Sequence, residues 1–123
     1  MTRVLHIALT PDWETALNQG RYEISTRGVT LAQEGFIHCS TAQQAPKVFE
    51  LFYADLAPED LRLLVVDEEQ CRELGTPMRW DEVPGSDRPF PHFYGPIPVS
   101  AVVAVLEFSG SGLPDVSGYD VES

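Results

Sequence analysis

The chain has 123 residues, of which 43% are hydrophobic, and this is enough to form the core of one domain without disulfide bonds. The 19 acidic residues against 8 basic ones give a formal net charge of −11, which disfavours bulk binding to nucleic acid or to anionic membranes. Two cysteines do not make a disulfide framework, and no signal peptide or long apolar run opens the chain. A cytoplasmic location is therefore expected.

Strand and helix patterns alternate along the chain. In chain order we expect a strand at residues 4–9, a helix at 10–18, extended chain at 21–25, a strand at 35–40, a helix after residue 40, and strands at 61–66, 78–83 and 101–108. The first helix has a start signal in Thr10-Pro11 and ends before Gly20. For the second helix, Ser40 to Gln43 fits a capping box, so Pro46 would lie in its second turn and either kink it or make it begin later.

Leu61 to Val66 is a continuous apolar run, which is typical of a central strand and places Leu64 in the core. The order of the elements predicts an α+β domain over residues 1–108, with mostly antiparallel small sheets and two or three short helices. Residues 109–123 are rich in glycine, serine and acidic residues and contain little apolar side chain, so they are expected to form a disordered tail.

All three histidines, His6, His38 and His92, lie in apolar or aromatic segments. An imidazole in such a segment needs a hydrogen-bond partner, a ligand or a metal to offset its desolvation. Strand alternation places each of them on the face opposite the more apolar side chains, so all three could line one shared cleft. The alternative is three separate half-buried histidines, each bonded to a nearby carbonyl.

Other side chains suggest different chemistries. Cys39 adjoins His38, but neighbours on a strand face opposite ways, so Cys39 is expected to be a small core residue and not a nucleophile. Three histidines can also bind zinc, as in metal hydrolases, although here they are far apart in the sequence and include no His-x-His or His-x-x-x-His pair. The acidic runs Asp67 to Glu69 and Asp81-Glu82 are expected to be solvated loop residues.

Two blocks of the sequence carry a resemblance to a known family. They are Gly35-Phe36-Ile37-His38-Cys39-Ser40 and Phe90-Pro91-His92-Phe93-Tyr94-Gly95-Pro96, and with Val4-Leu5-His6 they resemble the bacterial and plant family called domain of unknown function 952 over residues 4 to 108. The resemblance implies an ADP-ribosyltransferase-like fold with an NAD-sized cleft between small sheets. It also implies that His6 holds the ribose, that Phe36 or His38 lies near the nicotinamide, and that His92 stands where such enzymes have a glutamate.

The sequence therefore predicts a histidine-lined cleft that binds a nucleotide-like or NAD-derived small molecule, with NAD or a nucleotide favoured over zinc. The resemblance implies that a catalytic form of the protein would be a divergent ADP-ribosyltransferase-type enzyme, and whether the protein is an enzyme stays open. The expected catalytic residues are His92 and His38, and the expected ligand-binding residues are His6, Ser40, Tyr94 and Phe36. Two alternatives stay open: a non-catalytic module that binds a metabolite or a protein partner, and a metal-dependent hydrolase that uses the three histidines. The sequence assigns neither metal ligands nor an oligomeric state.

Overall fold

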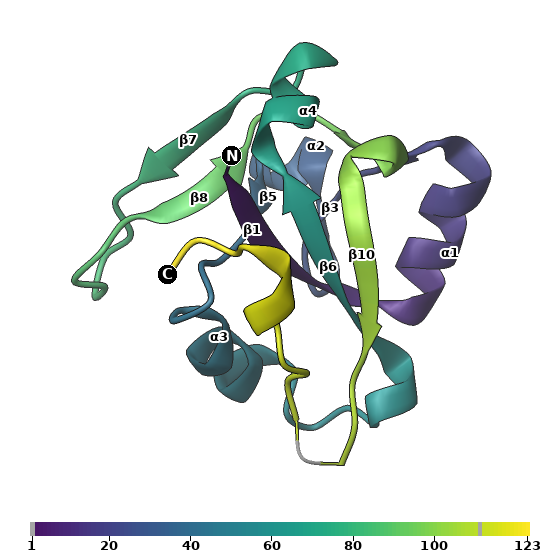
Figure 1. Ribbon diagram of the computed structural model, residues 1–123, viewed down its shortest axis with the longest axis vertical. Helices are drawn as coiled ribbons and strands as arrows, with labels where there is room; N and C mark the ends of the chain where they lie inside the picture. Colours follow the sequence, from purple (N-terminus) through teal and green to yellow (C-terminus); the bar gives the residue numbers. More distant parts are fainter. Residues whose placement is uncertain (1, 111) are drawn as a thin grey trace.

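The computed structural model describes residues 2–110 and 112–123, and in these residues it has an α+β architecture of small antiparallel sheets and four α-helices (Figure 1). The strands are β1 (Arg3–Leu9), β2 (Arg21–Tyr22), β3 (Ile24–Thr26), β4 (Val29–Thr30), β5 (Ile37–His38), β6 (Leu61–Asp67), β7 (Met78–Asp81), β8 (Phe90–Phe93), β9 (Ile97–Pro98) and β10 (Val102–Glu107). The helices are α1 (Thr10–Gln19), α2 (Leu31–Glu34), α3 (Ala45–Phe52) and α4 (Glu68–Glu73). The expected α+β class with mostly antiparallel sheets is confirmed.

β6 is the central strand of a three-stranded sheet with the order β1-β6-β10. Both neighbours pair with β6 in the antiparallel sense. Leu64 and Val66 project into one hydrophobic cluster, and Leu63 and Val65 project into a second cluster on the opposite face. A strand covered on both faces needs apolar side chains at every position, which explains the continuous apolar run.

β1 is also covered on both faces, and this corrects the expectation for His6. Leu5 and Ile7 belong to the second cluster, whereas Val4 and Ala8, which share a face with His6, belong to the first. His6 is only 3% exposed. The face that alternation assigned to an open cleft is therefore part of the interior, because other elements of the chain cover it.

A second three-stranded sheet, with the order β5-β8-β7, carries the histidine segments. Ile37 pairs with Phe93 in this sheet, and both side chains are buried in the first cluster. His38 pairs directly with His92 at the adjacent position of this antiparallel pair, so both imidazoles project from the opposite face. In Figure 1 this sheet lies above α3.

The end of α1 agrees with the sequence prediction, whereas the start of α3 differs slightly from it. Helix α1 ends at Gln19, and Gly20 caps it as expected, with the left-handed φ of 85° that glycine adopts readily. The cap before α3 is shifted by one residue, because Gln44 N donates to Thr41 Oγ1 and Thr41 N donates to Gln44 Oε1. The helix then begins at Ala45, so Pro46 falls in its first turn, where the missing N–H costs nothing.

The number of helices exceeds the two or three expected, because two short helices follow capping residues. Thr30 and Gln33 form a capping box at the start of α2, and the Asp67 side chain accepts a hydrogen bond from Gln70 N at the start of α4. The acidic run after β6 is thus part of a helix and not a loop. No helix in the described residues is long and apolar enough to cross a membrane.

The C-terminal segment is ordered where the structure describes it, contrary to the expected tail. Its spaced apolar side chains pack against the second cluster; they are Leu113, Val116, Tyr119 and Val121. Main-chain bonds hold its end, since Glu122 N donates to Arg3 O over 2.8 Å and Ala42 N donates to Glu122 O over 2.7 Å. Four apolar side chains are enough to hold this mostly polar segment in place, because the second cluster gives them an apolar surface to pack against.

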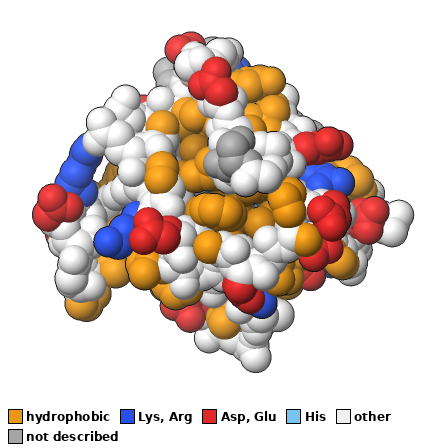
Figure 2. All heavy atoms as spheres, turned by 90° about the horizontal axis from the view of Figure 1, so that it is seen from below, with side chains coloured by type: hydrophobic (Ala, Val, Ile, Leu, Met, Phe, Trp, Pro, Cys, Tyr) orange, Lys and Arg blue, Asp and Glu red, His pale blue; other side chains and the backbone are white. Residues whose placement is uncertain are grey.

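Figure 2 shows hydrophobic side chains gathered toward the middle of the face seen from below, with acidic side chains mostly at its rim. On this face the excess of acidic residues is therefore dispersed and does not form one block.

Candidate functional site

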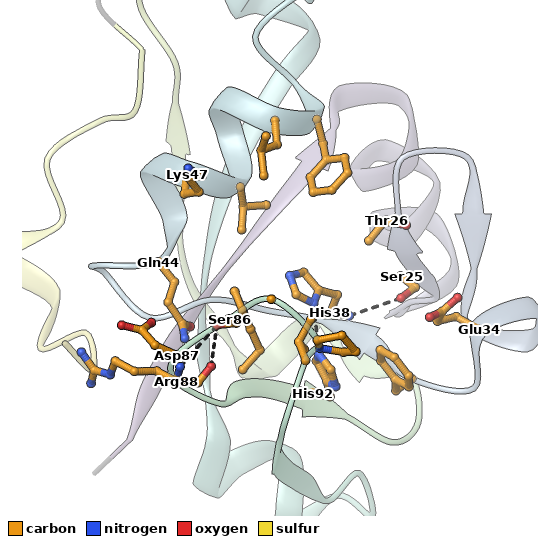
Figure 3. Close-up of a pocket in the computed structure, with 18 of the residues that line it drawn as sticks. Ser25, Thr26, Glu34, His38, Gln44, Lys47, Ser86, Asp87, Arg88 and His92 are labelled. Atoms are coloured by element: carbon orange, nitrogen blue, oxygen red, sulfur yellow. Dashed lines mark hydrogen bonds between the residues drawn. The ribbon is translucent and has the colours of Figure 1, made fainter.

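A cleft of about 870 Å³ lies between α3, the β5-β8 face and the loop that precedes β8. Its lining combines aromatic rings, hydroxyls, amides and charges, and Figure 3 shows His38 in the middle of it. The residues that line it are Ser25, Thr26, Glu34, Phe36, His38, Gln43, Gln44, Lys47, Val48, Leu51, Phe52, Val83, Pro84, Gly85, Ser86, Asp87, Arg88, Phe90 and His92. The volume lies within the range of small-molecule sites.

One face of α3 forms a wall of this cleft. The lining residues Gln44, Lys47, Val48, Leu51 and Phe52 recur at helical spacing, so they share that face. Leu51 is 60% exposed and Phe52 is 56% exposed, which is unusual for large apolar side chains. The wall thus changes from polar at the start of the helix to apolar at its end.

His38 and His92 are in direct contact across β5 and β8. The Nδ1 atom of His38 lies 3.0 Å from the Nε2 atom of His92, and the ring centroids are 5.1 Å apart. The main-chain N–H of His38 also donates to Ser25 Oγ over 3.3 Å. The strand register therefore brings together two histidines that are 54 residues apart in the chain.

Asp81 completes this contact from the third strand. His92 Nδ1 lies 2.8 Å from Asp81 Oδ2, and the Tyr94 hydroxyl donates to the same carboxylate oxygen. The hydrogen bond from Tyr94, reinforced by that from His92, lowers the pKa of Asp81. Asp81 is therefore ionised at neutral pH and acts only as an acceptor.

The ionised Asp81 carboxylate can only accept a hydrogen bond, and this determines which nitrogen of each neutral imidazole carries the proton. His92 must carry its proton on Nδ1 to donate to Asp81, which leaves Nε2 as an acceptor. His38 must then donate from Nδ1, and its Nε2 keeps a lone pair. No described residue donates to that atom. We call this chain of hydrogen bonds the Asp81–His92–His38 relay.

Both imidazoles of the relay are neutral at pH 7. Burial lowers the pKa of His38 to about 3, with His92 and His6 nearby adding to the effect. Burial also lowers the pKa of His92, although the Asp81 carboxylate opposes this. The cleft therefore presents a neutral hydrogen-bond acceptor at its centre.

His6 lies behind the cleft wall and does not line it. Its Nδ1 atom is 2.7 Å from the main-chain oxygen of His38, and its Nε2 atom is 2.9 Å from the Tyr22 hydroxyl. Burial lowers the pKa of His6 to about 4. With both nitrogens bonded inside the protein, His6 supports the main chain at His38 and has no free nitrogen for a ligand.

Of the other three site residues predicted from the sequence, one lines the cleft and two do not. Phe36 lines the cleft and stacks on His92, with a centroid distance of 4.1 Å and an interplanar angle of 12°. Ser40 is 4% exposed and pairs through its main chain with Leu5, outside the cleft lining. Tyr94 contacts the relay only through Asp81 and also lies outside the lining.

Cys39 is 1% exposed and belongs to the first hydrophobic cluster, as its strand position predicted. Burial raises the pKa of its thiol well above the ordinary value, which is the opposite of what a nucleophilic cysteine needs. In the described residues, no group of three or more His, Cys, Asp and Glu side chains is arranged to hold a metal ion. The geometry thus lends no support to a three-histidine zinc site.

Asp81 is the residue of the relay that sequence reasoning missed. A weak signal existed, because alternation along residues 78–83 places Asp81 and Arg79 on one face of a strand. The structure pairs Arg79 with His92, and the Arg79 guanidinium lies 4.9 Å from the centroid of the Tyr94 ring. Without that pairing, Asp81 is indistinguishable from the many solvated acids of the chain.

Comparison with known proteins places the chain in a family. Its global fold is similar to a crystal structure of protein CC0527 from Caulobacter crescentus, with 33% identity, a TM-score of 0.73 and coverage of 93% of this chain and 94% of that chain. The solution structure of the same protein gives 30% identity, a TM-score of 0.67 and coverage of 94% and 93%. The comparison with curated proteins found no match. The profile of the family described as "Protein of unknown function (DUF952)" matches residues 7–105, and the chain therefore belongs to the DUF952 family.

Proposed function

We propose that the cleft binds a small nucleotide-like or NAD-derived molecule and that His38 is the central residue of this site. The observation that carries the proposal is the position of His38, whose Nε2 atom has no donor among the described residues and whose ring lies in the middle of the cleft. His38 Nε2 is not one of the side-chain atoms of the described residues that are both buried and without a partner, so it is open to the cleft, where a ligand O–H or N–H group can donate to it.

Aromatic rings around His38 support a planar ligand. The Phe90 ring centroid is 4.9 Å from that of His38, and Phe36 stacks on His92 beside it. The half-exposed Leu51 and Phe52 face them from α3. Planar rings such as a nucleobase or nicotinamide gain from contact with aromatic and apolar side chains of this kind.

A catalytic role for the same site follows from the relay. If His38 Nε2 accepts a proton from a ligand hydroxyl, the positive charge on His38 is stabilised through His92 by the Asp81 carboxylate. His38 is then the residue that exchanges the proton with the ligand, and His92 positions it. An ADP-ribosyltransferase-like fold and reaction are the narrower form of this proposal, and they rest on the sequence resemblance alone.

The second candidate is a binding module without catalysis, and the low pKa of His38 favours it. A base with a pKa of about 3 accepts a proton poorly at pH 7, whereas a neutral imidazole remains a good hydrogen-bond acceptor. A cytoplasmic location is part of both candidates, because nucleotides are plentiful there and both cysteines are free thiols.

Thermal shift with NAD, ADP-ribose, AMP and adenosine tests the proposal, since a ligand that binds the folded state raises the melting temperature. We expect at least one of them to stabilise the protein, and His38→Ala to abolish the shift. Arg72→Gln, on α4 and outside the cleft, is the control and should leave the shift unchanged. Absence of any shift, or an equal shift in His38→Ala, would refute the proposed site. Chromatographic detection of NAD cleavage then separates the enzyme from the binding module.

A further inference from the structure

The relay gives the cleft an acceptor that does not change into a donor. Asp81 accepts hydrogen bonds from Tyr94 and His92, and these bonds lower the pKa of its carboxyl, so it stays ionised at neutral pH. Because Asp81 only accepts, His92 donates to it from Nδ1, and His38 then donates from its own Nδ1 to His92. As long as the relay is intact, His38 Nε2 offers the ligand a lone pair and no proton.

Contacts on several sides hold the His38 ring in this orientation. The main-chain N–H of His38 donates to Ser25 Oγ over 3.3 Å, and the main-chain oxygen of His38 lies 2.7 Å from His6 Nδ1. The ring centroid of His38 is 4.9 Å from that of Phe90 and 5.1 Å from that of His92. A half-turn of the imidazole would place a ring carbon against His92 Nε2 and would break the 3.0 Å contact between the two histidines. The folded structure, and not the ligand, therefore determines which nitrogen faces the cleft.

The charges along the cleft do not by themselves select between anionic and neutral ligands. The charged side chains of the lining are two carboxylates, Glu34 and Asp87, and two cations, Lys47 and Arg88, so their formal charges cancel. Selection at the centre of the cleft depends instead on hydrogen bonding at His38. A ligand group that only accepts hydrogen bonds would bring its own lone pair against that of Nε2, and it would leave both acceptors without a donor.

We infer that His38 selects the chemical class of the ligand: the group that meets Nε2 is an uncharged hydrogen-bond donor on a planar ring, such as the N–H of a carboxamide, and the corresponding ketone or carboxylate is disfavoured. This inference rests on the proposed function, because it concerns the same cleft and the same nitrogen. It adds that Asp81, which does not line the cleft, controls this specificity as a positioning residue that acts through His92.

Three pyridines of similar size test the inference. Nicotinamide carries an N–H donor, the corresponding methyl ketone has a methyl group in place of the amino group, and nicotinic acid carries a carboxylate. In NMR titrations that follow the His38 ring signals, we expect nicotinamide to bind the parent protein roughly tenfold more tightly than the ketone, which is about the size of one hydrogen bond. Nicotinic acid should bind no more tightly than the ketone. Because nicotinamide and the ketone are both uncharged, their ratio measures the donor and not the charges of the lining.

Two variants connect this preference to the relay. Asp81→Asn replaces an obligate acceptor with an amide that can also donate, so the chain of hydrogen bonds can reverse and present an N–H at His38 Nε2. The preference for nicotinamide over the ketone should then largely disappear, mainly because the ketone binds more tightly. His38→Gln, whose amide both donates and accepts, should also remove the preference. Glu82→Gln changes the net charge as Asp81→Asn does, but it lies outside the relay and the cleft lining, and it should keep the ratio of the parent protein.

The outcomes separate this inference from the proposed function. Equal affinity of the parent protein for nicotinamide and the ketone, or a preference that Asp81→Asn keeps in full, would overturn the selection by the relay while leaving the cleft as a ligand site. Tighter binding of nicotinic acid than of nicotinamide would overturn it as well. If none of the three pyridines binds, the inference fails, whereas the proposed function is decided separately by the thermal shifts with NAD, ADP-ribose, AMP and adenosine.

Discussion

The Nδ1 atom of His38 lies 3.0 Å from the Nε2 atom of His92, and this contact determines what each histidine can do. His92 bonds to Asp81 through its other nitrogen, so it has none left for a ligand. His38 retains Nε2. The pair that the sequence assigned jointly to catalysis therefore divides into one residue with a free nitrogen in the cleft and one that orients it.

The relay predicts the tautomer of each imidazole. At pH 7, we expect ¹⁵N-detected NMR to show His92 and His38 protonated on Nδ1 and unprotonated on Nε2, because Asp81 can only accept. Asp81→Asn should disturb both tautomers, since an amide can also donate. Glu82→Gln removes a neighbouring carboxylate that no relay bond uses, and should leave them unchanged. Nε2 protonation of His38 in the parent protein would contradict the relay.

The buried His6 predicts a loss of stability on acidification. Its pKa is about 4 in the folded protein and about 6.5 when unfolded, so below pH 6.5 the unfolded chain binds a proton that the folded protein does not. Its contribution to stability is complete above pH 6.5 and falls by about 3 kcal/mol as the pH drops to 4. Urea unfolding of the parent and of His6→Gln between pH 7.5 and 4.5 measures this. Parallel pH profiles for the two proteins would show that His6 is not the cause.

Leu64 tests the central strand. Because Leu64 is fully buried, Leu64→Ala should lower the free energy of unfolding by about 2 to 5 kcal/mol through the cavity it leaves. Leu74→Ala is the matched control at a site that is 60% exposed, and it should change stability by no more than about 0.5 kcal/mol. Denaturant titration measures both, and similar losses in the two variants would argue against the central position of β6.

The cysteines should be unreactive in the native protein. Burial raises the pKa of the Cys39 thiol well above its ordinary value and that of Cys71 to about 12, so little thiolate exists at pH 7. A chromogenic disulfide reagent should modify both cysteines as fast as the protein unfolds in denaturant. In the native protein, without denaturant, it should modify both of them only slowly. Fast modification of Cys39 in the native state would instead revive its role as a nucleophile.

The C-terminal segment should contribute to stability. Removal of residues 113–123 exposes the part of the second cluster that Val116, Tyr119 and Val121 cover, and it should cost about 2 to 4 kcal/mol of unfolding free energy. Glu122→Ala is the control, because the hydrogen bonds recorded for Glu122 are main-chain bonds that alanine keeps. An unchanged denaturation midpoint after truncation would show that the packing of this segment is not stabilising.

Local patterns in the sequence were sufficient to predict most elements of the fold. The apolar run around Leu64 predicted the central strand, Gly20 predicted the end of α1, and the position of Cys39 beside Ile37 predicted its burial. Each of these features depends on neighbours within a few residues, because helix ends and strand faces follow from spacing along the chain. The ordered C-terminal segment escaped prediction, since its stability comes from a core surface supplied by distant strands.

The candidate site was only partly visible in the sequence. The three histidines were recognisable from their apolar surroundings, but alternation could not show that other elements cover His6 or that β7 places Asp81 against His92. Those facts depend on strand register and on which elements pack over each face, and both are determined by contacts between segments tens of residues apart. The sequence alone thus determined that the histidines need partners, and only the tertiary structure decided that Asp81 and His92 leave His38 as the one with a nitrogen free for a ligand.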